Sequence, residues 1–366
     1  MLTNNEGPIP VIDISGSLPE AEVAKQLVDA AATYGFVYIR NLGRDIPAEA
    51  IDRTFDLSKK FFSSSIEEKQ GCKITENACA SHICGRFQRV PRHAPLPNVT
   101  MSENLTPLSR AMNFGDFVDG KAQQPLPPSL APHESELDEF QQYCHKLKSC
   151  FDCTKQIDPA AGGSSWFASR HHGGPTGCIL RLLHYPSIPA DSDYQPDVDI
   201  RAGAHSDYGS ITLLFQRPSQ PGLEILPPSS SSSSPPQWTP VPISPSPTTH
   251  DPSPPILVNI GDLLSHWTNN LLKSTVHRVI FPTASSPSDI ADRYSIAYFC
   301  HPVGSTVLES VPSERVRAFG ENKGNKGNTE GNEGKKITAD EHLMGRLRAT
   351  YLGMYGNEEK KGEEEK

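Results

Sequence analysis

The stretch Ala204-His-Ser-Asp-Tyr-Gly209, followed later by His277 and by Arg293-Tyr-Ser295, decides how this chain is interpreted. Two imidazoles and one carboxylate, here from His205, His277 and Asp207, can occupy one triangular face of octahedral Fe(II). The other three positions then stay open for a chelating substrate and O₂. The arginine lies two residues from a serine hydroxyl and is suited to binding a distal carboxylate. The pattern therefore predicts an Fe(II) site with a carboxylate clamp.

Each of these groups also has a simpler interpretation when it is taken alone. A His-x-Asp pair is common, and a histidine inside a strand is more often a core residue whose hydrogen bonds are satisfied. The arginine could be an exposed residue beside an ordinary serine. However, residues two apart on a strand share a face, which brings His205 together with Asp207 and Arg293 together with Ser295. The joint pattern favours the metal site.

Length and charge limit the possible functions. The chain has 366 residues, enough for a sizeable core, and a net charge of −9. This charge does not support binding to nucleic acid or to an anionic membrane. No apolar stretch approaches the roughly 20 residues of a membrane span. Residues 1–8 have neither the basic start nor the apolar run of a secretory signal. We expect a cytoplasmic monomer whose partner is a small-molecule substrate.

The eight cysteines are scattered. Cys150-Phe-Asp-Cys153 has the spacing of a redox pair, but no βαβ pattern surrounds it. A second group could in principle bind zinc, and consists of Cys72, Cys79, His82 and Cys84. Reduced, uncoupled thiols are the expected state in a cytosolic chain.

Hydrophobic periodicity predicts two different halves. The first half mixes strands and helices, with Ser17 as a candidate N-cap and Met112–Phe117 as a further ordered piece. The second half consists of short strands separated by turn residues, which indicates an antiparallel sandwich or barrel. The predicted strands are 9–14, 36–39, 178–185, 210–215, 223–226, 256–260, 276–280 and 294–299, and the predicted helices are 19–33, 46–62 and 134–153.

Low-complexity segments interrupt this pattern. Residues 227–255 contain a serine run and many prolines, so we expect a flexible surface insertion, with Trp238–Val241 as a possible ordered piece. Residues 320–334 form a second loop of this kind, and a charged tail begins at Gly356.

The chain resembles the Fe(II)/2-oxoglutarate-dependent dioxygenases of the isopenicillin N synthase-like superfamily. The resemblance covers about 9–70 and 176–305 in family order, and its motifs are jointly specific. They are Pro10–Asp13, Tyr34–Val37, Leu180–Pro186, Ala204–Gly209, Val258–Asp262, Trp267–Arg278 and Arg293–Ser295. The resemblance implies a mainly β fold with flanking helices, built on a distorted double-stranded β-helix (jelly roll) core that follows an α/β N-terminal domain.

The resemblance also implies a division of the chain. The N-terminal dioxygenase domain would span 1–120, and its segment 72–110 departs from the family pattern by being rich in Cys and Pro. A helical and Gly/Ser-rich connection would follow over 121–175. The catalytic jelly roll would span 176–310 and include the insertion at 227–255. A C-terminal helix, a loop and a charged tail would occupy 311–366.

By the same resemblance, His205, Asp207 and His277 would bind the iron, while Arg293, Ser295 and Tyr185 would bind the far carboxylate of 2-oxoglutarate. No catalytic residue is expected beyond the metal centre. Several neighbours are less specific, because aromatic, turn and strand residues look alike in sequence. Tyr208 and Phe299 are candidate pocket residues, Asn259 and Asp262 are expected to shape a strand-to-helix turn, and Arg181 and His184 could be structural.

The favoured function is oxidation of a small organic molecule by hydroxylation or desaturation, with Fe(II), 2-oxoglutarate and O₂ as cofactors and succinate and CO₂ as co-products. Three alternatives stay open. An Fe(II)/O₂ oxidase of the same fold would use the arginine for a substrate carboxylate, and a non-catalytic binding protein would only retain the fold. A zinc hydrolase needs a general base near the metal, and no adjacent glutamate is present.

Overall fold

The computed structural model describes residues 9–72, 87–90, 109–149, 166–188, 199–227, 237–282, 291–309, 311–322 and 336–348. Its helices are α1 (Glu20–Thr33), α2 (Ala48–Phe62), α3 (Ile66–Gly71), α4 (Glu134–Ser149), α6 (Asp262–Trp267), α7 (Glu314–Asn322) and a last helix over 339–348. Of the cysteine groups named above, only Cys72 lies among the described residues, and it is a free thiol. Within the described part of the chain, no helix is long and apolar enough to cross a membrane.

Eight strands form a major sheet in the order β1-β2-β10-β7-β12-β5-β4-β3. They are β1 (Val11–Ile12), β2 (Phe36–Ile39), β3 (Phe87–Val90), β4 (Ser109–Phe114), β5 (Ile179–Tyr185), β7 (Ile211–Gln216), β10 (Ile256–Ile260) and β12 (Arg293–Cys300). Strands from the first 120 residues thus extend both edges of the sheet whose centre comes from the second half. The N-terminal region and the core share one sheet.

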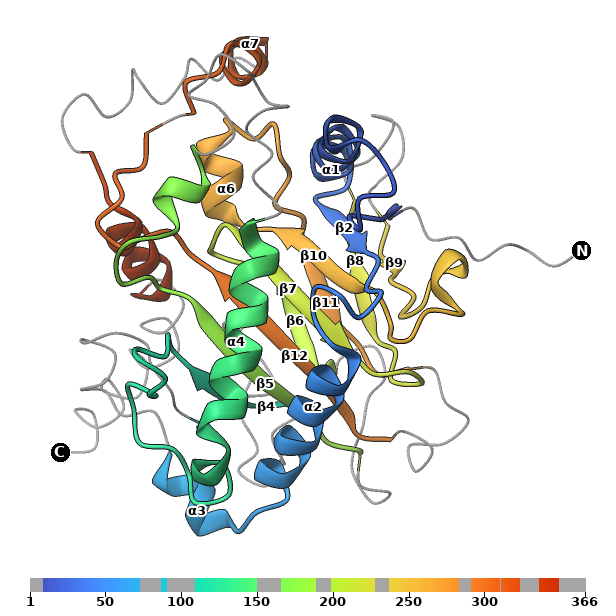
Figure 1. The fold of residues 1–366 in the computed structure, drawn as a ribbon, viewed down its shortest axis with the longest axis vertical. Helices are drawn as coiled ribbons and strands as arrows, with labels where there is room; N and C mark the ends of the chain where they lie inside the picture. Colours follow the sequence, from blue (N-terminus) through green and yellow to red (C-terminus); the bar gives the residue numbers. More distant parts are fainter. Residues whose placement is uncertain are drawn as a thin grey trace, which may run out of the picture.

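A minor sheet of four strands has the order β6-β11-β8-β9. Its strands are β6 (Ala202–His205), β8 (Leu223–Ile225), β9 (Thr239–Pro240) and β11 (His277–Val279). Figure 1 shows α4 crossing one face of the major sheet. Apolar residues from β8 and β11 pack with Tyr38, Tyr185 and Leu257 of the major sheet, so the minor sheet covers its opposite face. Two packed sheets with helices on one side agree with the expected jelly roll.

Alternation along the central strands gives the major sheet two different faces. In β12, Ile296 and Tyr298 join the large apolar cluster under the helices, whereas Arg293, Ser295 and Phe299 face the minor sheet. The same alternation holds in β7 and β10, whose helix-facing residues are all apolar, and in β4 and β5 except at the paired residues Arg110 and His184. Most polar residues of these strands are therefore gathered in the space between the two sheets.

The helix-side core explains why α2 and α4 form where they do. Phe55, Phe61 and Phe62 lie on one stripe of α2 and are buried, as Phe140 of α4 is. The predicted helices 19–33 and 46–62 are confirmed. The predicted cap is wrong, because α1 has Pro19 at its N-cap position and the Ser17 hydroxyl instead donates to Asp13.

The turn from α1 into β2 is tied to the segment that leads to β11. Gly35 has a φ of +69°, and a Cβ at this position would clash with the Lys273 carbonyl oxygen and with Thr275. The Thr275 hydroxyl donates to the Tyr34 carbonyl oxygen at 2.7 Å. The N-terminal region thereby fixes the chain two residues before His277.

The second-half strands are confirmed to within about a residue at each end. The expected flexible insertion differs from the structure over 237–255, while 228–236 lie outside the described residues. Residues 239–240 pair with β8, Val241 is buried, and Arg40 donates to both carboxylate oxygens of Asp251. This segment is ordered as a short strand, turns and the 3-10 helix Ser246–Thr248, because β8 and residues that follow β2 provide hydrogen-bonding partners.

Candidate metal centre

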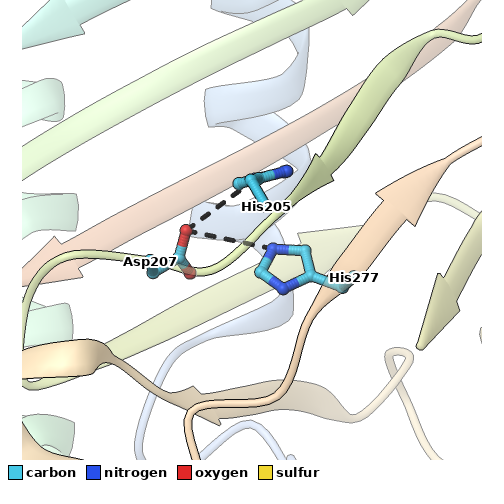
Figure 2. Close-up of side chains that lie close together, drawn as sticks. All are labelled: His205, Asp207 and His277. Carbon is cyan, nitrogen blue, oxygen red and sulfur yellow. Dashed lines mark ion pairs between the residues drawn. The ribbon is translucent and has the colours of Figure 1, made fainter. Parts of the chain in front are cut away.

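Three predicted metal ligands meet at one edge of the minor sheet. His205 is the last residue of β6 and His277 is the first of β11, where the two are paired across the strands. Asp207 follows β6 in the turn toward β7, rather than on the strand as expected. Its Oδ1 lies 4.0 Å from His205 Nε2 and 3.9 Å from His277 Nε2. Figure 2 shows both rings turned toward this carboxylate.

One ligand atom from each residue lies within 4.8 Å of the other two. The hydrogen bonds of the rings identify which nitrogens are available. Nδ1 of His205 lies 2.7 Å from the Gly203 carbonyl oxygen, and Nδ1 of His277 lies 3.2 Å from that of Thr275. A carbonyl oxygen only accepts, so each Nδ1 carries the proton and each Nε2 keeps a lone pair for a metal.

The carboxylate of Asp207 is oriented in the same manner. Its Oδ2 accepts from the Thr212 hydroxyl at 2.6 Å and from the Asn259 amide at 2.7 Å, which leaves Oδ1 toward the histidines. Burial acts to raise the pKa of Asp207, but the histidines and these two donors outweigh it, so the pKa lies below its ordinary value. The group is held as an anion.

The pKa of His205 is also shifted in the direction that suits a ligand. Desolvation by the surrounding protein lowers it, and the nearby His277 and Arg181 add to the effect. A neutral imidazole is the form that coordinates a metal. Two imidazole nitrogens and one carboxylate oxygen converge, a donor set that fits Fe(II) with one face left open.

Asp262, at the start of α6, joins both ligand-bearing segments. Its backbone N–H donates to the Asp207 carbonyl oxygen at 2.7 Å. Its carboxylate accepts from the Ser206 hydroxyl at 3.1 Å and from the Ser274 hydroxyl at 2.6 Å. Arg346 of the last helix donates to it at 2.6 Å. The expected turn-shaping role of Asp262 thus extends to positioning the segments that carry the ligands.

The predicted carboxylate clamp lies on the face of the major sheet that looks toward the minor sheet. Arg293 is 1% exposed, and its guanidinium contacts Ser295 Oγ at 3.2 Å, Gln216 Oε1 at 3.3 Å and the Gln220 carbonyl oxygen at 3.2 Å. The Tyr185 ring lies 5.2 Å from it. No carboxylate of the described residues pairs with Arg293. Burial lowers the pKa of this arginine, which nevertheless stays charged.

The less specific candidates fall on different sides of the sheet. His184 faces the helices, pairs with Asp292 at 2.8 Å and stacks on Tyr294, so it is structural. Phe299 faces the minor sheet, as expected for a pocket residue. Tyr208 follows the candidate ligand Asp207, and the Arg346 guanidinium covers its ring at 4.9 Å.

Sequence reasoning missed the partners of Asp207. Asn259 was expected only to shape a turn, and Thr212 was not singled out. Alternation could have found both, because each is a polar residue between apolar residues that face the helices. Their pairing across β10 and β7, Asn259 opposite Thr212, brings them to one carboxylate.

Comparison with known proteins agrees with this geometry. The family model of the 2OG-Fe(II) oxygenase superfamily matches residues 176–302. A second model, described as non-haem dioxygenase in morphine synthesis N-terminal, matches residues 9–105. Together the two matches cover more than half of the chain.

Individual relatives are similar over nearly the whole chain. A UPF0676 protein of Schizosaccharomyces pombe is 35% identical, covering 94% of this chain and 92% of its own length. The homoarginine-6-hydroxylase 2-ODD-C23 of Glycine max is 28% identical, over 94% and 98%. Among solved structures, a full-length Neurospora crassa protein in complex with alpha-KG and thymine has a TM-score of 0.70 and 27% identity, over 96% and 99%.

Proposed function

The chain belongs to the 2OG-Fe(II) oxygenase superfamily, and on this premise we propose that His205, Asp207 and His277 bind the iron of a 2-oxoglutarate-dependent oxygenase. It is an oxidoreductase that oxidises a small molecule. Arg293, Ser295 and Tyr185 bind the distal carboxylate of 2-oxoglutarate. When bound, Fe(II), 2-oxoglutarate and O₂ together supply the oxidising chemistry, with succinate and CO₂ as co-products.

One observation carries this proposal: among the described residues, no carboxylate pairs with the buried guanidinium of Arg293, which faces the same interior as the histidine and aspartate side chains. A buried cation is costly unless an anion compensates it. The acceptors that the described residues offer to Arg293 are all neutral: Ser295, Gln216 and the Gln220 carbonyl group. A dicarboxylate that reaches from the metal to Arg293 supplies the missing charge.

The other residues of the centre act by orientation. The Gly203 and Thr275 carbonyl groups keep Nε2 of each histidine free, and Asn259 and Thr212 hold the carboxylate of Asp207. The apolar contact of the two sheets buries Tyr185 of the clamp, whereas the His205 side chain stays 47% exposed to solvent. The protein thus contributes position and environment, while the cofactors carry the oxidation.

The named relatives act on or bind chemically different compounds, homoarginine and thymine. Both are small, which supports a small organic substrate. We also propose that the protein acts as a cytoplasmic monomer without a nucleic-acid or membrane partner. The net charge of −9 supports the absence of a nucleic-acid or anionic-membrane partner.

Anaerobic titration with Fe(II) and then 2-oxoglutarate tests this function. A weak metal-to-ligand charge-transfer band in the visible spectrum on addition of 2-oxoglutarate is the expected result, because the co-substrate chelates the iron. Iron binding without that band would favour the Fe(II)/O₂ oxidase. Absence of iron binding would contradict both enzymes and favour the non-catalytic binding protein.

A further inference from the structure

The last helix, over 339–348, starts from a fixed point on the chain that follows β12. It begins with a capping box, in which the Glu341 backbone N–H donates to the Thr338 hydroxyl at 3.2 Å and the Thr338 N–H donates to the Glu341 carboxylate at 2.9 Å. The Ala339 N–H donates to the Thr306 carbonyl oxygen at 2.8 Å. The direction of the helix is therefore set at its first turn.

Side-chain contacts hold the body of this helix against the catalytic core. Leu343 packs so closely on Gly177 that a Cβ at the glycine would lie 2.7 Å from Leu343 Cδ2. The His342 ring lies 6.5 Å from the His266 ring of α6. The helix is thus docked between α6 and the chain that leads into β5.

Arg346 reaches the ligand-bearing segments from this helix. Its guanidinium donates to Asp262 Oδ2 at 2.6 Å and lies 4.9 Å from the centroid of the Tyr208 ring. Tyr208 directly follows the candidate ligand Asp207 in the chain. Asp262 is bonded to the same ligand, because its N–H donates to the Asp207 carbonyl oxygen at 2.7 Å. Both contacts of the arginine therefore end on residues next to Asp207.

The carboxylate of Asp262 connects the two segments that carry the ligands. Its Oδ2 accepts from Ser206, which lies between the first two candidate ligands, and its Oδ1 accepts from Ser274. Ser274 precedes Thr275, whose carbonyl oxygen orients the ring of His277. A charged partner on Oδ2 favours one rotation of the carboxylate, and in that rotation each oxygen faces one serine. The arginine thus helps to hold both segments in register.

We propose that Arg346 is a positioning residue for the metal centre, which acts through Asp262 and couples docking of the last helix to metal affinity. The inference rests on the proposed function, because that function assigns the metal to His205, Asp207 and His277. Linkage makes the coupling reciprocal, so bound metal should favour the docked helix by the same factor. A direct electrostatic effect has the opposite sign, since removal of a positive charge favours the binding of a cation.

Titration of the metal-free full chain with Co(II), a stand-in for Fe(II) followed by its visible absorption, tests the proposal. R346Q should lower Co(II) affinity about two- to fivefold, the range that corresponds to a partly exposed ion pair. R346K keeps the charge beside Asp262 and should regain most of the wild-type affinity. Because the Arg346 side chain is 45% exposed, unfolding of the metal-free variants should match that of the wild type.

A double-mutant cycle with D262N identifies the route of the effect. D262N should lower Co(II) affinity more than R346Q does, because it removes the negative charge and one of the two acceptor oxygens. In the D262N background, R346Q should cause a smaller loss than it causes in the wild type. An equal loss in both backgrounds would overturn the proposed route through Asp262. An unchanged or raised affinity in R346Q alone would overturn the proposal as a whole.

R53Q is the matched control. The Arg53 side chain is 46% exposed and pairs with Glu136 at 2.5 Å, between α2 and α4 on the helix side of the major sheet. R53Q should leave Co(II) affinity unchanged. If R53Q lowers the affinity as R346Q does, the effect is one of general stability and the proposal fails.

Hydrogen exchange over 336–348 measures the reciprocal effect. Saturating Co(II) should slow exchange in the last helix about two- to fivefold in the wild type and should leave it unchanged in R346Q. Equal slowing in both proteins would contradict the role of Arg346. Failure of the wild type to bind Co(II) would count against the proposed function and this inference together. Co(II) binding that R346Q does not alter would count against this inference alone.

Discussion

The two sheets hold their parts of the site by different means. The major sheet carries Arg293 and Ser295 on β12, a strand whose other face is packed in the large apolar cluster under α2 and α4. The minor sheet carries His205 and His277, and β6 is partly or fully exposed along its whole length. Close packing fixes the clamp, while hydrogen bonds fix the metal ligands.

This difference indicates where the enzyme is sensitive. Packing distributes the cost of a substitution over many contacts, whereas a hydrogen-bonded ligand depends on one or two partners. Polar changes near the minor sheet should therefore alter metal affinity more than stability. Changes near the clamp should leave Fe(II) affinity unchanged and weaken the binding of 2-oxoglutarate.

The largest effect is expected from D207A. Loss of the anionic member of the proposed triad should lower Fe(II) affinity and succinate formation by more than about 100-fold. This exceeds the loss of about 10- to 100-fold that is typical when a residue hydrogen-bonded to a metal ligand is removed. D207A also leaves the buried Thr212 and Asn259 donors unpaired, so stability should fall by about 1–3 kcal/mol per group while the apolar clusters, which do not include Asp207, keep the chain folded. Iron binding by calorimetry and succinate release measure the result.

The matched control for D207A is D251A, which removes another buried carboxylate, the partner of Arg40. It should lower stability and leave iron binding intact. Full activity of D207A would contradict the assignment of the metal centre.

R293A tests the other sheet. Removal of the buried guanidinium should weaken 2-oxoglutarate binding by about 10- to 150-fold, corresponding to about 1.5–3 kcal/mol for a charged hydrogen bond. Fe(II) affinity should not change. S295A should give a smaller loss of the same kind, because its hydroxyl is neutral. An unchanged 2-oxoglutarate requirement in R293A would place the clamp elsewhere.

N259A tests whether a residue that is hydrogen-bonded to a proposed metal ligand affects iron binding. The amide of Asn259 donates to the Asp207 carboxylate, so its loss should lower Fe(II) affinity about tenfold. N41A is the control, since Asn41 is equally buried but bonds to the Ile46 carbonyl group and to Ser253. N41A should reduce stability without changing iron affinity. A similar iron affinity in both variants would mean that hydrogen bonding does not tune this centre.

Short strands predicted an antiparallel sandwich or barrel, while the resemblance carried by the motifs and their order implied the jelly roll and supported the metal residues that meet at the centre. Their partners were harder to predict, because they depend on strand register. The sequence positions of Asn259 and Asp207 do not show that the two side chains are hydrogen-bonded. Strand β10 and the turn after β6 are brought together only when the chain folds. The same holds for Asp262 and Arg346, which are 84 residues apart in the chain.

Amino-acid composition gave a wrong prediction for residues 237–255, where distant hydrogen-bonding partners order the segment. The residues after 236 are rich in proline and serine, and local propensity predicts a flexible insertion. In the structure, Asp251 and Ser253 receive hydrogen bonds from Arg40 and Asn41, which follow β2. These partners lie about 210 residues earlier in the chain, beyond the reach of any local pattern.

The smallest effect is expected on the helix side of the major sheet, from D292N. The hydrogen bond from His184, followed by that from the Ser187 backbone, lowers the pKa of Asp292 from 3.8 to about 2. The folded state therefore gains stability from the carboxylate at pH values above about 4 and loses it as the pH falls toward 2. Because the Asp292 side chain is 42% exposed, solvent screening limits this gain to less than about 1 kcal/mol.

Urea unfolding of wild type and D292N at pH 7, 5 and 3.5 measures this contribution. The difference in unfolding free energy should be similar at pH 7 and 5 and should shrink at pH 3.5, where the carboxylate of the unfolded chain is largely protonated. Iron and 2-oxoglutarate affinities at pH 7 should match the wild type, although Asp292 directly precedes Arg293 in the chain. A loss of 2-oxoglutarate affinity in D292N would show that the clamp depends on surface charge next to β12 rather than on packing alone. The contrast between the two sheets would then fail for the major sheet, because it predicts that 2-oxoglutarate binding at the clamp is independent of the charge on Asp292.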